Sequence, residues 1–91
     1  MQPIPFDTLA EYLKHGREIE FFYNSKRYSI TNHSGFWYFC DDSSHILLNI
    51  LCPFQEKELL VSKISEIRID GIPIPHIFDK QLYDPDLLYI F

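Results

Sequence analysis

Two segments in the first half of the chain carry apolar residues at every second position. Residues 18–23 read EIEFFY, and residues 27–31 read RYSIT. Because successive side chains of a β-strand point to opposite faces, both segments are predicted to be strands. The Asn-Ser pair between them favours a tight turn, so the two strands should form a hairpin.

The next two segments are apolar at nearly every position. Residues 36–40 read FWYFC, a pattern typical of a central strand that has helices packed on at least one side. Residues 45–51 read HILLNIL, and Pro53 ends this run, which predicts a fourth strand. Polar turns at 32–35 and 41–44 connect these strands into an antiparallel meander.

Three other segments carry the wider spacing of an amphipathic helix. The first is predicted over 7–15, after two prolines and before Gly16, which favours a helix end. The second is predicted over 56–64 and the third near 75–82. The side chains expected to face the core are Phe6, Leu9, Ala10 and Leu13 in the first helix, Leu59, Leu60 and Ile64 in the second, and Ile77, Phe78 and Leu82 in the third.

This order of elements predicts an α+β fold. An N-terminal helix precedes a three- to four-stranded antiparallel meander, and the helices should pack on one face of the sheet. Residues 66–69 fit either a short strand or the end of the second helix. A chain of 91 residues is expected to form a single domain, 1–91.

The last five residues, LLYIF, are a separate apolar segment. An apolar end that stays free lowers solubility, so it should either add an edge strand to its own sheet or dock on a partner. The intramolecular arrangement is favoured, because a domain this small needs its apolar residues in its core. The alternative is self-association through the tail, which would make the chain a homodimer.

The negative charge of the chain is confined to its second half. Residues 1–40 carry equal numbers of acidic and basic side chains, whereas residues 41–91 hold nine acidic and four basic ones, which accounts for the net charge of −5. This balance argues against nucleic-acid binding, which requires clustered Lys and Arg. It is compatible with a basic protein partner, and also with solubility alone. The candidate partner-binding residues are Asp41, Asp42, Glu56, Glu58, Asp84 and Asp86.

The sequence indicates a cytoplasmic protein. The N-terminus lacks the basic and apolar regions of a signal peptide, and no apolar run approaches the length of a membrane span. Cys40 and Cys52, the two cysteines, are therefore expected to be reduced thiols.

No motif indicates a cofactor or a catalytic centre. His33, Cys40 and His45 are the nearest approach to a metal site, but they lack close ligand pairs such as C-x₂-C, and the meander would place the two histidines at opposite ends of the third strand. The nucleophile motif G-x-S-x-G does not occur. A small metal-dependent enzyme is thus the weakest interpretation, and no enzymatic activity is predicted.

The pattern REIEF, KRYSITN, a Trp-Tyr strand and IDG before a short helix resembles a group of small uncharacterised α+β proteins of Firmicutes. The resemblance covers about residues 6–80 and implies the fold, with no catalytic residues to carry over. The sequence departs from the group in IPIP after Asp70-Gly71 and in its apolar tail. The function expected from the residues is that of a small acidic protein-binding module, such as an immunity or inhibitor protein that neutralises a basic effector or toxin.

Overall fold

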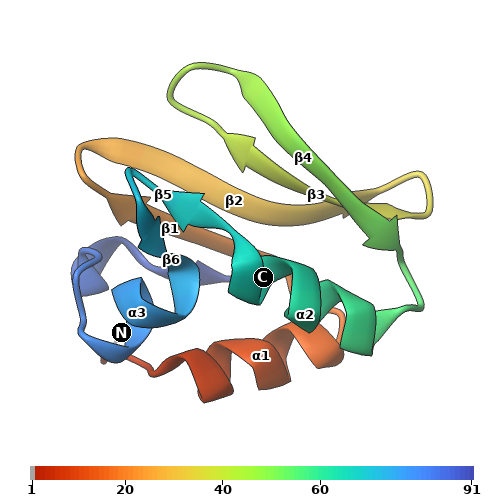
Figure 1. The fold of residues 1–91 in the computed structure, drawn as a ribbon, viewed down its shortest axis with the longest axis horizontal. Helices are drawn as coiled ribbons and strands as arrows, with labels where there is room; N and C mark the ends of the chain where they lie inside the picture. Colours follow the sequence, from red (N-terminus) through yellow and green to blue (C-terminus); the bar gives the residue numbers. More distant parts are fainter. Residues whose placement is uncertain (1) are drawn as a thin grey trace.

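The computed structural model describes residues 2–91 and has an α+β architecture. Figure 1 shows the sheet above and the helices below it. The longer elements, in chain order, are α1 (Phe6–Lys14), β1 (Ile19–Tyr23), β2 (Lys26–His33), β3 (Phe36–Asp41), β4 (Ile46–Pro53) and α2 (Lys57–Glu66). The shorter ones are β5 (Arg68–Ile69), β6 (Ile72–Pro73), α3 (Ile74–Asp79), the 3₁₀ turn η1 (Pro85–Leu87) and β7 (Tyr89–Ile90).

The main sheet has five antiparallel strands in the order β4-β3-β2-β1-β7. Strands β1 to β4 form the predicted meander, and β7 is added beside β1 by the end of the chain. Residues 66–69, which the sequence left open, divide between the last residue of α2 and the short strand β5, which pairs with β6.

The turn between β1 and β2 has the backbone conformation expected of a tight hairpin. Asn24 and Ser25 both have positive φ angles, 52° and 66°. Type I′ turns require this conformation at both central positions, and their twist matches that of the flanking strands. The second hairpin turn, at Ser34 and Gly35, uses positive φ angles in the same way.

Alternation along the strands sends every second side chain to the helix side of the sheet. Trp37 lies at the centre of this core: its side chain is fully buried, its ring stacks on Phe54 with centroids 5.5 Å apart, and its indole N–H donates to the Phe54 carbonyl at 3.0 Å. The other fully buried large side chains of the core are Phe21, Phe39, Phe78, Leu9, Leu13, Ile19, Ile30, Leu60, Ile64, Ile74 and Ile77.

Two of the helical predictions are wrong in detail. Leu59 was expected to face the core but is exposed, because Leu60 and Ile64, one turn apart, set the buried face of α2 about 100° away from it. The third helix ends at Asp79 instead of continuing to Leu82, which follows a residue with positive φ and lies exposed.

The apolar tail docks on its own sheet, as the favoured sequence prediction had it. Ile90 pairs with Ile19 in β1, and Leu88 is buried. Arg17 holds the end of the chain, because its Nε donates to the carbonyl oxygen of Phe91 at 2.8 Å. Within residues 2–91 the structure has no helix with the length and apolar character needed to cross a membrane.

Candidate functional site

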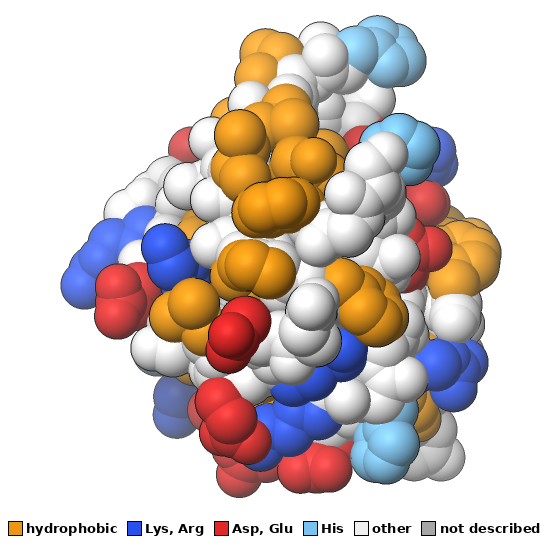
Figure 2. Space-filling model, turned by 90° about the vertical axis from the view of Figure 1, so that its right-hand side faces the viewer, with side chains coloured by type: hydrophobic (Ala, Val, Ile, Leu, Met, Phe, Trp, Pro, Cys, Tyr) orange, Lys and Arg blue, Asp and Glu red, His pale blue; other side chains and the backbone are white. Residues whose placement is uncertain are grey.

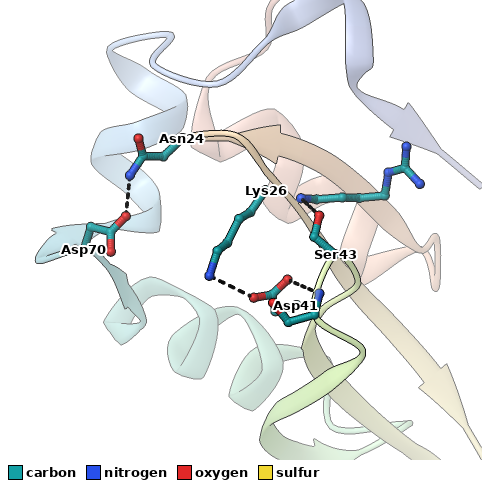
Figure 3. A network of polar contacts seen from close by, with 7 residues as sticks. Asn24, Lys26, Asp41, Ser43 and Asp70 are labelled. Carbon is teal, nitrogen blue, oxygen red and sulfur yellow. Dashed lines mark hydrogen bonds and ion pairs between the residues drawn. The ribbon is translucent and has the colours of Figure 1, made fainter.

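Asp41, predicted as a partner-binding residue, faces inward and serves the turn between β3 and β4. Its side chain is buried, lies 3.5 Å from Lys26 Nζ and accepts the backbone N–H of Ser44 at 3.1 Å (Figure 3). Burial alone would raise the pKa of this carboxyl, but the hydrogen bonds from Ser44 and the charge of Lys26 outweigh it and lower the pKa below its ordinary value. The carboxylate of Asp41 is thus engaged by contacts within the fold.

The same end of the sheet is tied together by further polar contacts (Figure 3). Ser43 Oγ accepts the backbone N–H of Arg27 at 2.9 Å. Asn24, in the turn between β1 and β2, donates to the carboxylate of Asp70, in the turn between β5 and β6. These contacts join turns that are distant in sequence, and their role is structural.

The other predicted acidic residues are more accessible. Asp42 is half-buried and accepts the Ser29 hydroxyl at 3.1 Å. Glu56 and Glu58 are exposed at the start of α2, where negative charge favours the helix dipole. Asp84 and Asp86 are exposed; Asp84 caps η1, and its carboxylate accepts the N–H of Asp86 at 2.9 Å.

These acidic residues do not gather on one surface. Asp41 closes β3, whereas Glu56 follows the end of β4, which pairs with Phe36 at the start of β3. A strand rises about 3.3 Å per residue, so the two groups lie roughly 17 Å apart along the sheet. Asp84 lies toward the same end of the sheet as Asp42, because its backbone N–H donates to Phe22, which pairs with Arg27 beside Asp42.

The most distinctive surface of the molecule is apolar and lies on the β3–β4 hairpin. Figure 2 shows a column of hydrophobic side chains that descends from the top of the molecule, where Figure 1 places this hairpin, with charged side chains gathered lower down. Five of the nine exposed large hydrophobic side chains of the described chain belong to the hairpin. We call this set the hairpin patch; it consists of Phe36, Ile46, Leu47, Leu48 and Ile50.

The hairpin patch is exposed because β4 is the outermost strand of the sheet and rises away from the helices (Figure 1). Its pairing with β3 also shifts register twice, so that Leu48 and Leu51 are extra residues in β4. Such bulges bend a strand and increase its twist. Only the end of β4 reaches the core, where Leu51 and Cys52 are both buried.

The outer face of the sheet divides into a polar half and an apolar half. On β1 and β2 it carries polar side chains such as Arg27, whose Nε lies 3.3 Å from a Glu20 oxygen. On β3 and β4 the outer face is apolar. Tyr38 pairs there with Ile50, and Cys40 pairs with Leu47. The apolar half continues the hairpin patch from the strand edge onto the face of the sheet.

The residues considered for metal or nucleophilic chemistry are not brought together. His33 pairs with Phe36 at one end of β3, whereas Cys40 and His45 lie near its other end, as the predicted meander required. No group of three potential metal ligands occurs within residues 2–91.

Both cysteines are free, as predicted. Burial raises the pKa of each thiol; Asp42 raises that of Cys40 further, and for Cys52 the positive charge of Lys63 opposes the effect of burial without cancelling it. Both thiols are therefore protonated at neutral pH and are not activated nucleophiles.

The sequence interpretation missed the hairpin patch, although it contained a signal. The run HILLNIL was taken as one more apolar strand, but Asn49 interrupts it and no helix is predicted to cover its far side. An apolar strand with a polar residue at its centre, at the end of a meander, is an edge strand whose side chains are only partly covered. No family model, curated protein or solved structure matches the chain, so the evidence for its function is the structure itself.

Proposed function

We propose that this chain is a protein-binding module and that the hairpin patch is its contact surface. The observation that carries the proposal is the exposure of Ile46, Leu47, Leu48 and Ile50 on one open edge of the sheet. Contiguous exposed apolar surface of this kind marks interaction sites in soluble proteins. Its burial by a partner would supply the affinity.

The proposed role is binding and not catalysis. The two thiols are protonated, and the buried carboxylate of Asp41 is occupied by Lys26 and Ser44. The polar side chains in Figure 3 form hydrogen bonds that join turns of the fold to one another. These groups support a fold that presents a surface, which favours a module acting through association.

In its most specific form, the proposal is an inhibitor or immunity protein that covers a surface of a basic effector or toxin. The net charge of −5 supports this form, because opposite charge accelerates association. The exposed Glu56 and Glu58 are suited to attract such a partner. Replacing both by Lys should slow association and weaken its dependence on salt, while the melting temperature falls only by the small amount that negative charge contributes at the start of α2. Association that is insensitive to salt would contradict this electrostatic form.

The alternative function is self-association. The tail is not free to mediate it, because β7 is paired with β1. A second copy of the chain would have to use the hairpin patch as well. The two occupants respond oppositely to salt: screening weakens attraction to a basic partner, but it relieves the repulsion between two chains of net charge −5.

Site-specific photocrosslinking tests the proposal. A photoreactive amino acid would replace Leu47 in the patch or, as the control, Leu82 after α3; the two side chains are 50% and 47% exposed. After irradiation in the cells that express the chain, we expect a discrete crosslinked protein from position 47 and none from position 82. The same partner, once purified, should bind Ile50→Ser at least about tenfold more weakly than the wild type.

Two results would overturn the proposal. Equal crosslinking from positions 47 and 82 would show that contact is not specific to the patch. Unchanged affinity of the purified partner for Ile50→Ser and for Leu47→Ser would show that the patch does not supply the binding energy.

A further inference from the structure

A groove runs along β4 beside α2 and β5, and two residues of the hairpin patch, Leu48 and Ile50, take part in its lining. One hollow of about 420 Å³ lies between the end of β4 and the end of α2. A second, of about 330 Å³, lies between the middle of β4 and β5. Asn49, Ile67 and Arg68 line both hollows, so the two form one continuous groove beside the open edge of the sheet.

The two walls of this groove differ in chemistry. The β4 wall is apolar at Leu48, Ile50 and Leu51, whereas the opposite wall carries the cations Lys63 and Arg68. Among residues 2–91, neither of these two cations forms an ion pair.

Arg68 Nη1 donates to the carbonyl oxygen of Gly71 at 3.1 Å, but none of the described acidic side chains that line the groove pairs with Lys63 or Arg68. Glu66 lines the first hollow but does not reach ion-pair distance of either cation. In the second hollow Asp41 is paired with Lys26, and Asp70 accepts a hydrogen bond from Asn24. Two uncompensated cations beside an apolar strand therefore remain, within a chain whose net charge is −5.

We propose that this groove binds an extended segment of the partner protein, with an acidic side chain of that segment held by Lys63 and Arg68. This inference rests on the proposed protein-binding function and specifies what is bound. An extended segment points alternate side chains in opposite directions, so apolar residues can meet Leu48 and Ile50 while a neighbouring carboxylate reaches the cationic wall. Because Arg68 Nη1 donates to the Gly71 carbonyl oxygen, Nε and Nη2 remain to bind the carboxylate with two hydrogen bonds, which fixes the register.

Asn49 is placed to recognise the backbone of the segment. It lies at the junction of the two hollows, and its amide both donates and accepts hydrogen bonds. The bulges at Leu48 and Leu51 interrupt the ladder of β4, so a long added strand is disfavoured. Side-chain contacts in the groove would thus supply most of the specificity.

A locally acidic segment is compatible with a partner that is basic overall. Attraction between the net charges acts at long range and sets the rate of encounter, and it is screened over about 8 Å at physiological ionic strength. The contact between a carboxylate and the pair Lys63 and Arg68 is local and affects mainly the lifetime of the complex.

Selection from a random heptapeptide phage library on the immobilised full chain tests the inference. We expect the enriched peptides to contain Asp or Glu next to apolar residues. In fluorescence anisotropy, Lys63→Glu and Arg68→Glu should each weaken binding of a labelled enriched peptide at least about tenfold. Lys80→Glu, which makes the same charge change at an exposed lysine outside the groove lining, should leave the affinity within about twofold.

Enrichment of no peptides, enrichment of peptides without acidic residues, or unchanged affinity for both groove variants would overturn the inference. Sedimentation equilibrium identifies a second copy as the occupant: self-association that Arg68→Glu abolishes would also overturn it. The proposed function is tested separately, because a partner that crosslinks from position 47 in the Arg68→Glu background, with unchanged affinity, would leave the hairpin patch as the binding surface and reject the groove.

Discussion

The two edges of the main sheet are finished in opposite ways. At one edge, the two-residue strand β7 pairs with β1, and Leu88 beside it is buried. At the other, the eight-residue strand β4 has no neighbour on its outer side among residues 2–91 and exposes four large apolar side chains. An unpaired edge invites contact with other chains.

The difference between the two edges separates apolar residues that stabilise the fold from apolar residues that do not. Both edges carry apolar sequence, LLYIF at one and ILLNIL at the other. The chain uses the first to complete its own sheet, and Arg17 fastens its end through the Phe91 carbonyl. The second is left outside the core except for Leu51, and its exposed side chains are the surface that we propose a partner covers.

The largest effect is expected on the buried face of the hairpin itself. Trp37→Ala should lower the free energy of unfolding by about 3–5 kcal/mol, because the lost ring leaves a cavity against Phe54. Phe36→Ala, one residue earlier but within the hairpin patch, should cost less than about 0.5 kcal/mol. Denaturant unfolding of the two variants separates the faces of β3, and equal losses would contradict the division.

Removal of the tail should be the next most damaging change. Deletion of residues 87–91 uncovers β1 and removes the buried Leu88, which should cost about 3 kcal/mol and promote aggregation. Tyr89→Ala, at an exposed position of the same tail, serves as the control and should have little effect. Thermal melting and light scattering are the measurements; a truncated chain as stable and soluble as the wild type would show that this edge is not needed.

The turn that supports β4 should show a pH dependence. The pKa of Asp41 is lowered in the folded chain, so its stabilising contribution is present above the unfolded value, about 3.9, and is lost as the pH falls through the folded value. Asp41→Asn should therefore be less stable than the wild type at pH 7. Unfolding measured between pH 7 and pH 3 should show this difference shrinking below about pH 4. If the difference in stability between Asp41→Asn and the wild type did not change with pH, the contribution of Asp41 would come from its packing and not from its charge.

The fold was predictable where local chemistry and burial agree. The turn residues Asn24 and Ser25, and the alternation in β1 and β2, specify the first hairpin without reference to the rest of the chain. The α+β class and the docking of the tail followed from such patterns. The C-terminal limit of α3 could not be predicted in this way. Leu82 is apolar and fits the helical spacing, but it lies beyond a backbone turn that has no signal in the sequence.

The candidate site was predictable only in part, because exposure depends on neighbours that lie far away in sequence. Asp41 is polar and adjacent to Asp42, so it resembles an exposed turn residue, but strand alternation after Phe39 turns it inward toward Lys26. The apolar run of β4 resembles a buried strand, and only its place at the edge of the sheet exposes it. The alternation that buries Asp41 can be read along β3, whereas the exposure of β4 depends on the strand order of the whole sheet.

The central claim is that the exposed apolar residues of β4, such as Leu47 and Ile50, are not required by the fold, whereas the buried Leu88 beside β7 is. The most direct measurement compares the free energy of unfolding of the double variant Leu47→Ala/Ile50→Ala with that of Leu88→Ala. We predict a loss below about 1 kcal/mol for the double variant and of at least about 2 kcal/mol for Leu88→Ala. A double variant that loses as much stability as Leu88→Ala would contradict the account, because β4 would then serve the core and not a partner.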